Sequence, residues 1–224
     1  MVDDQEREQA ILDAAAELLL RAGYNKLTMG DVAETVGLHR GLVYLRFASK
    51  DELVDAVTRR ELDRYAESWS EHLRADPRGG SVASVYRAMA AALRELPLAA
   101  AIVARDVDVF GKYLRKSGNF AVRVEHFGTR EFVRMMQEAG AVRADIDGDA
   151  VAFVLDSLTP ALRETFPHRR EAAGHPDLPT TEAVVGALSQ LLELGLTPPA
   201  SADLEAGKAL LLEMLSTLRS RPST

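Results

Sequence analysis

The side chains best suited to bind another molecule lie in a short basic stretch of an acidic chain. Between Leu38 and Lys50 the sequence contains Arg40, Arg46 and Lys50 and no Asp or Glu, although acids outnumber bases over residues 1–60 and the net charge is −7. Guanidinium and ammonium groups bind phosphate oxygens, and an arginine fork also fits O6 and N7 of guanine. Such local positive charge indicates a single face that meets phosphate, rather than a protein that coats nucleic acid.

The residues around this stretch predict two short helices that would position the basic side chains. Thr28 can cap the first helix with its hydroxyl, and Gly37 can end it, because glycine adopts positive φ at little steric cost. The second helix is expected from His39 to Phe47, with Leu38, Val43 and Phe47 on its inner side. Its outer face is then basic and consists of His39, Arg40, Leu42 and Arg46.

A capping box predicts that a third, much longer helix follows directly. Ser49 and Glu52 have the S-x-x-E spacing, and the helix is expected from Asp51 to Ala75. An amphipathic helix from Gln5 to Ala22 supplies the apolar partner for the two short helices. The sequence therefore predicts a tri-helical head over residues 1–50 and a second domain over 51–224, with 51–75 as the linking helix.

The second domain is expected to be all-helical, because no segment alternates with the period of two that a strand requires. Residues 166–179 contain several prolines and predict a loop. The fold class is thus all-α, a helix-turn-helix head joined by a long helix to a larger helical domain. Its helices are expected near 82–96, 98–104, 107–114, 120–139, 147–165, 181–194 and 201–218.

Composition narrows the class of protein further. Hydrophobic residues make up 47% of the 224 residues, which is ample for a buried core, and the absence of cysteine excludes disulfides and thiolate chemistry. The N-terminus is acidic without an apolar run, and no apolar stretch reaches the ~18 residues of a membrane span. We expect a cytoplasmic protein without a signal peptide, and no cofactor.

The N-terminal residues resemble the TetR family of bacterial one-component transcriptional regulators. The resemblance implies a homodimer whose two heads bind a pseudo-palindromic operator on double-stranded DNA, and whose helical domain holds a small-molecule effector. Repression is the usual outcome in this family, and activation remains an alternative. The residues that stand at the family's spacings are Ile11, Leu12, Ala14, Ala15, Gly23, Thr28, Val32, Ala33, Gly37, Gly41, Tyr44, Phe47, Lys50 and Leu53.

The resemblance also implies which residues bind DNA. Thr28, Tyr44 and Lys50 match positions that hold the phosphate backbone, and the helix from His39 to Arg46 matches the one that enters the major groove. The sequence departs from the family at three places, with His39 for a capping Ser or Thr, Leu42 for a small hydroxylated residue and Arg46 for a frequent His. The predicted DNA-binding set is Thr28, His39, Arg40, Gly41, Leu42, Tyr44, Arg46 and Lys50.

The sequence distinguishes effector-binding residues from ordinary core residues less clearly than it distinguishes the DNA-binding residues. Aromatic and Met side chains are common both in cores and in adaptable apolar pockets. His126 and Asp156 could orient a ligand, although solvent-exposed helix positions are favoured for both. A metal pair of His168 and His175 is disfavoured because no Cys or fixed carboxylate joins them. The candidates for an effector pocket are Tyr86, Met89, Phe110, Tyr113, Phe127, Met135 and Phe153.

Two other classes of function compete with a transcriptional regulator. An enzyme is disfavoured because the sequence contains no Gly-rich phosphate loop, nucleophile elbow or H-E-x-x-H motif. A protein-interaction module that keeps the helical head without reading DNA is the third reading. For a regulator, the helices near 147–165 and 181–194 are the expected dimer surface. Its expected mechanism is that effector binding tilts the long helix and changes the separation of the two recognition helices.

Overall fold

The computed structural model describes residues 4–115, 129–163 and 179–220, and all of the regular structure in these ranges is helical. The predicted all-α fold class is confirmed. The chain forms two compact units, which we describe separately: the first contains the described residues of 4–62 and 97–115, and the second those of 63–96, 129–163 and 179–220. Helix α4 (Lys50–Ala75) contributes its N-terminal half to the first unit and its C-terminal half to the second.

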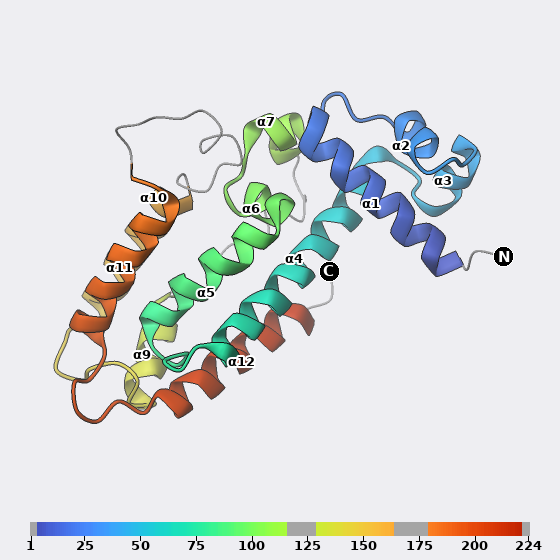
Figure 1. Cartoon of the computed structure of the whole chain (residues 1–224). Helices are drawn as coiled ribbons and strands as arrows, with labels where there is room; N and C mark the ends of the chain where they lie inside the picture. Colours follow the sequence, from blue (N-terminus) through green and yellow to red (C-terminus); the bar gives the residue numbers. More distant parts are fainter. Residues whose placement is uncertain (1–3, 116–128, 164–178, 221–224) are drawn as a thin grey trace. The chain divides into compact units, whose positions relative to one another are not determined.

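The first unit begins with the predicted helix-turn-helix. Helix α1 (Asp4–Ala22) packs against α2 (Met29–Thr35), and α2 packs against α3 (Arg40–Arg46) (Figure 1). The Thr28 side chain caps α2 by accepting a hydrogen bond from the Asp31 amide, and Gly37 follows α2 with φ of +66°. The predicted helix start and stop signals are therefore both confirmed.

The start of α4 is also fixed by its caps, with one difference from the expected pattern. The Glu52 amide donates to the Ser49 hydroxyl at 3.1 Å, as the capping box predicts. The Glu52 carboxylate accepts from the Ala48 amide at 2.7 Å, one residue before the amide that a standard box would use. Both bonds occupy backbone donors at the helix start, so α4 begins at Lys50, immediately after the head.

Three short helical segments that follow α5 in the sequence also belong to the first unit. These are α6 (Pro97–Val103), α7 (Val107–Phe110) and the 3-10 helix η1 (Gly111–Arg115). The single helix expected near 107–114 is wrong, because Gly111 has φ of +47° and divides it into α7 and η1. Segments α6 and α7 both pack on α1, so they complete the core of the helix-turn-helix.

The second unit is a bundle of longer helices, α5 (Val82–Glu95), α9 (Thr129–Glu138), α10 (Gly148–Arg163), α11 (Thr181–Leu196) and α12 (Leu204–Ser220). Helix α11 packs on α5, and α10 packs on α9. Side-chain caps fix the first turns of two of these helices. Asp147 accepts hydrogen bonds from the first amides of α10, and Thr180 accepts one from the Ala183 amide of α11.

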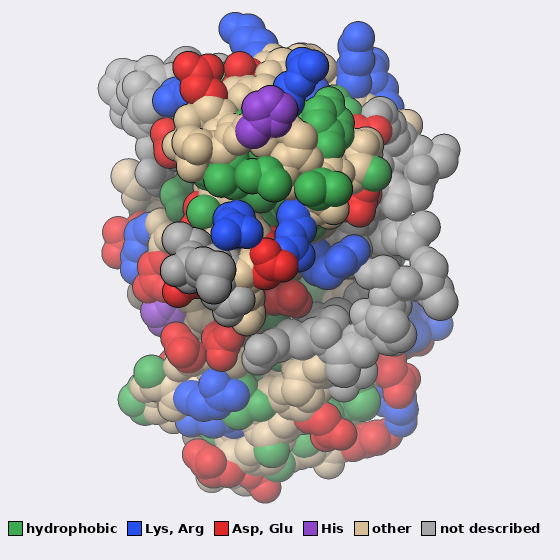
Figure 2. Space-filling model, turned by 90° about the vertical axis from the view of Figure 1, so that its right-hand side faces the viewer, with side chains coloured by type: hydrophobic (Ala, Val, Ile, Leu, Met, Phe, Trp, Pro, Cys, Tyr) green, Lys and Arg blue, Asp and Glu red, His purple; other side chains and the backbone are tan. Residues whose placement is uncertain are grey.

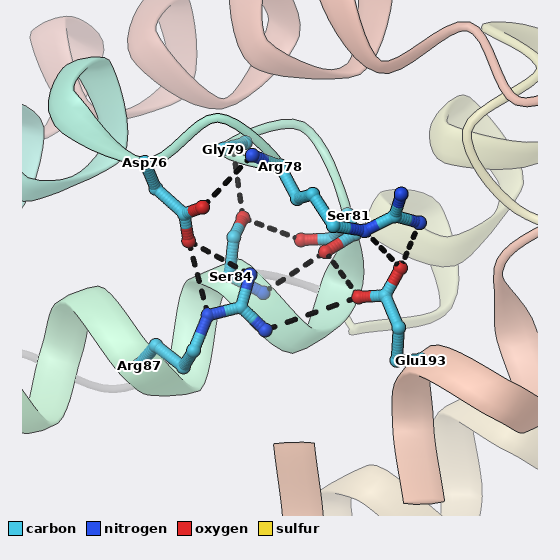
Figure 3. Close-up of polar contacts among 7 residues, drawn as sticks. All are labelled: Asp76, Arg78, Gly79, Ser81, Ser84, Arg87 and Glu193. Atoms are coloured by element: carbon cyan, nitrogen blue, oxygen red, sulfur yellow. Dashed lines mark hydrogen bonds and ion pairs between the residues drawn. The ribbon is translucent and has the colours of Figure 1, made fainter. Parts of the chain in front are cut away.

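A polar network joins α11 to the turn between α4 and α5 (Figure 3). The Glu193 carboxylate of α11 accepts from Arg78 at 2.7 Å and from the Ser81 hydroxyl at 3.0 Å, and it lies 3.9 Å from Arg87 of α5. Arg87 also donates to Asp76, at 2.7 and 3.0 Å. These hydrogen bonds and ion pairs therefore link α11 to α5 and to the turn that follows α4.

The length and apolar character of the described helices can be compared with those of a membrane span. None of the helices in the described parts of the chain is both long and apolar enough to cross a bilayer.

Candidate DNA-binding surface

Helix α3 is held to the head by its inner side and leaves its outer side open. Val43 is fully buried and Phe47, the residue after the helix, is nearly so. Leu42 and Tyr44 are about half-exposed, and Leu45 is 80% exposed. Because exposed apolar side chains on a short helix gain nothing from the core, this face is suited to contact another molecule.

The first residue of this surface, His39, is a cap. Its Nδ1 atom accepts a hydrogen bond from the Gly41 amide at 3.2 Å, so His39 performs the capping role that a Ser or Thr usually has at such a position. The helix consequently begins at Arg40, one residue later than expected. Accepting at Nδ1 requires the neutral ring to carry its proton on Nε2, which makes that atom a hydrogen-bond donor.

The two arginines of α3 differ in their surroundings. Arg40 is exposed, and among the described residues its side chain makes no hydrogen bond or ion pair. Arg46 instead lies 2.5 Å from the Asp4 carboxylate and 3.8 Å from the Glu8 carboxylate, both on α1. Arg40 is thus the arginine of α3 that can engage a base or phosphate without first leaving an acid.

Lys50 is bound within the first unit. Its ammonium group donates to the carbonyl oxygens of Tyr24 at 2.6 Å and Leu27 at 2.8 Å, and lies 4.1 Å from the centroid of the Tyr24 ring. Thr28, the α2 cap, is exposed next to Leu27. Lys50 therefore links the first turn of α4 to the connection between α1 and α2, in addition to the phosphate contact that the sequence predicts for it.

Sequence reasoning missed the tyrosine–aspartate pairs that surround Lys50. The Tyr24 hydroxyl donates to Asp51, and the Tyr113 hydroxyl donates to Asp55, one helical turn further along α4. Burial, and then the nearby Asp55 carboxylate, raise the pKa of Tyr113 above its ordinary value. The available signal was the one-turn spacing of Asp51 and Asp55 on a predicted helix, which nothing in the sequence connects to Tyr113.

The effector candidates do not form one group. Phe110 and Tyr113 are fully buried in the core of the first unit, with their ring centroids 5.9 Å apart. Tyr86 and Met89 belong to the core of the second unit, where burial raises the pKa of Tyr86. Met135 on α9 is partly buried, whereas Phe153 on α10 is 73% exposed, and Phe127 lies outside the described residues.

Of the polar side chains considered for orienting a ligand or binding a metal, only Asp156 lies within the described residues. Asp156 is exposed on α10 and accepts a hydrogen bond from the Thr129 hydroxyl. His126, His168 and His175 lie outside the described residues, so the structure says nothing of the metal pair. Within the described ranges, no cluster of His and carboxylate side chains could hold a metal ion.

The charged surface is mixed. Figure 2 shows Lys and Arg side chains beside hydrophobic ones, with Asp and Glu interspersed, on the face that it presents. This pattern agrees with a net charge of −7 and a positive potential confined to particular side chains.

Comparisons with known proteins match the helix-turn-helix. Residues 11–57 match the family model described as bacterial regulatory proteins, tetR family. The transcriptional repressor Rv1474c of Mycobacterium tuberculosis is 27% identical over 162 residues, which cover 70% of this chain and 80% of the repressor. The transcriptional regulator TtgR of Pseudomonas putida is 36% identical over 81 residues, but these cover only 34% of this chain and 37% of TtgR.

The fold is shared with a solved structure of another protein. This structure is NalD, described as the secondary repressor of the MexAB-OprM multidrug efflux pump in Pseudomonas aeruginosa. The match covers 88% of this chain and 98% of the NalD chain, with a TM-score of 0.55 and 19% sequence identity. That identity shows a shared fold alone. The matched head and the all-helical fold agree, and residues 11–57 of this chain form a helix-turn-helix head of the TetR family of bacterial regulatory proteins.

Proposed function

We propose that this protein is a homodimeric repressor that binds a pseudo-palindromic operator and is released by a small-molecule effector bound in its second unit. It would act in the cytoplasm, where the operator is. The name of the Mycobacterium tuberculosis relative, a transcriptional repressor, supports repression over activation.

The observation that carries the proposal is the outer surface of α3. The inner side of the capped helix is buried through Val43 and Phe47, and His39, Arg40 and Tyr44 are exposed to solvent. A helix presented in this way fits the major groove, where Arg40 can hold guanine through two hydrogen bonds. Leu42 offers an apolar contact to a thymine methyl group, and Thr28 and Tyr44 offer hydroxyls to the phosphate backbone.

Large apolar side chains on two helices of the second unit support the homodimer. Leu191 and Leu194 of α11 are 70% and 80% exposed, and Phe153 and Val154 of α10 are similarly open. Exposed apolar surface of this kind is typical of a protein interface. A twofold pair of chains that buries it would also match a twofold operator.

The effector mechanism rests on the continuity of α4. This helix begins beside the head at Lys50 and ends in the polar network of the second unit near Asp76. An effector that prefers one position of α4 would change the separation of the two recognition helices. It can do so only by as much as its affinities for the two states differ.

Selection of bound sequences from random duplexes tests the proposal. The purified protein should enrich two related half-sites in inverted orientation. Arg40→Ala should weaken binding by ~1–3 kcal/mol and relax selection at one position of each half-site. Arg94→Ala, which removes an exposed arginine of α5 in the second unit, is the matched control and should change neither. If no sequence is enriched and Arg40→Ala leaves the weak binding unchanged, the protein is not an operator-binding regulator.

A further inference from the structure

Residues 97–115, which comprise α6, α7 and η1 and are called the strap below, contact the connection between α1 and α2 through their backbone. The Tyr24 amide donates to the Val109 carbonyl oxygen at 2.7 Å. Gly23 has φ of +78°, and a Cβ atom there would lie 2.5 Å from the Asp108 carbonyl oxygen. The two segments therefore meet closely enough that only glycine fits at position 23.

The strap is also bonded to α4. Tyr113 of η1 is fully buried, and its hydroxyl donates to the Asp55 carboxylate. A hydrogen bond to an ionised group is stronger than one between neutral groups, and a buried one is costly to leave unmade. Tyr113 therefore fixes the second turn of α4 against the strap.

Tyr24 connects this anchor to Lys50. The rings of Tyr24 and Tyr113 are tilted against each other with centroids 5.4 Å apart, and the Tyr24 hydroxyl donates to Asp51. The Lys50 ammonium group lies 4.1 Å from the centroid of the Tyr24 ring and donates to the Tyr24 carbonyl oxygen at 2.6 Å. A movement of the strap would thus shift the Lys50 ammonium group through the Tyr24 side chain.

We propose that the strap positions Lys50 for contact with an operator phosphate, with Tyr113 and Tyr24 as positioning residues that act through Lys50. This inference rests on the proposed function, because it needs an operator. A lysine has a long flexible stem and loses conformational entropy when it is held in one place. The ring and the carbonyls hold that stem before DNA arrives, so less entropy remains to be lost on binding.

The test measures how much the neutralisation of each operator phosphate weakens the binding of the wild-type protein and of each variant. Operator duplexes are prepared in which single phosphates are neutralised as methylphosphonates, and their dissociation constants are measured by fluorescence anisotropy. The phosphate whose neutralisation weakens the wild-type protein but has no effect on Lys50→Met is the Lys50 contact. Tyr113→Phe keeps the buried ring and removes only the hydroxyl, so circular dichroism should show an intact fold.

We expect Tyr113→Phe to weaken operator binding about three- to tenfold and to reduce the penalty for neutralising the Lys50 phosphate, with other phosphates unaffected. Asp55→Asn should act in the same direction. Tyr65→Phe, a buried tyrosine of α4 in the second unit, is the matched control and should have no effect.

Three results would overturn the inference while leaving operator binding in place. Lys50→Met could respond to the neutralisation of every phosphate as the wild-type protein does, Tyr113→Phe could leave the affinity unchanged, or Tyr113→Phe could weaken binding equally at all phosphates. The last result would mean that Tyr113 only stabilises the head. A failure to select any operator would instead contradict the proposed function.

Discussion

Arg46 of α3 and Asp4 of α1 form an ion pair of 2.5 Å, with the Glu8 carboxylate at 3.8 Å on the same guanidinium group. A phosphate that approaches Arg46 must therefore compete with two carboxylates. The N-terminal turns of α1 thus set part of the electrostatic cost of DNA binding.

Replacing both acids should strengthen binding to every duplex. We expect Asp4→Asn with Glu8→Gln to raise the affinity for operator and non-operator DNA alike by about three- to tenfold at low salt, and less near 0.2 M salt, where surface charges are screened. Anisotropy titrations at two salt concentrations measure this. Glu17→Gln, which removes an exposed acid of α1 that pairs with Arg21, is the control. A gain confined to the operator would contradict the electrostatic explanation.

The His39 cap predicts a stability effect that depends on the side-chain acceptor. His39→Ala leaves the Gly41 amide without its partner and should lower the free energy of unfolding by ~1 kcal/mol. His39→Ser restores an acceptor and should recover most of that loss. Urea unfolding followed by circular dichroism measures both variants, and equal losses for Ala and Ser would show that His39 does not stabilise α3 as a cap.

Glu193 predicts a stability effect in the second unit. Its carboxylate accepts from Arg78 and Ser81 and is only 22% exposed, so Glu193→Ala removes the acceptor that the Arg78 guanidinium group and the Ser81 hydroxyl share. We expect a loss of ~1–3 kcal/mol in unfolding free energy. Glu138→Ala is the control, because Glu138 pairs with Arg134 on the open surface of α9 and should contribute less than ~0.5 kcal/mol. Similar losses for both would argue against the network.

The exposed leucines of α11 predict the oligomeric state. Wild-type protein should be a dimer by light scattering at micromolar concentration, and Leu191→Glu with Leu194→Glu should be a helical monomer, because the interface would then have to bury four charges. Val107→Glu changes an equally exposed apolar residue of the first unit and should remain a dimer. A wild-type monomer, or a dimeric double variant, would contradict the proposed interface.

The local features of the head could be predicted from the sequence because they depend on residues a few positions apart. Thr28 and Asp31, or Ser49 and Glu52, form their capping bonds within one helical turn. The positive φ of Gly37 follows from the need to end α2. Such features need no knowledge of the rest of the fold.

The strap could not be predicted, because its contacts join residues far apart in the sequence. A buried tyrosine requires an acceptor, but many carboxylates could satisfy Tyr113, and only the folded chain selects Asp55. The pairing of Arg46 with Asp4 was missed for a similar reason, since both lie on polar faces whose alignment depends on how α1 crosses α3. Apolar periodicity also failed at Gly111, where a positive φ interrupts the helix.

The strap has a consequence for anyone who builds chimeric regulators from this chain. Phe110 and Tyr113 fill the same core as Leu19, Val32 and Leu53, so a head transferred by a single cut after residue 50 or 62 would leave these two rings behind. The graft would carry α3 but open a cavity in the core of the head. A recombinant DNA-binding domain made from this protein therefore has to combine two separate segments of the chain, the N-terminal helices and residues 97–115.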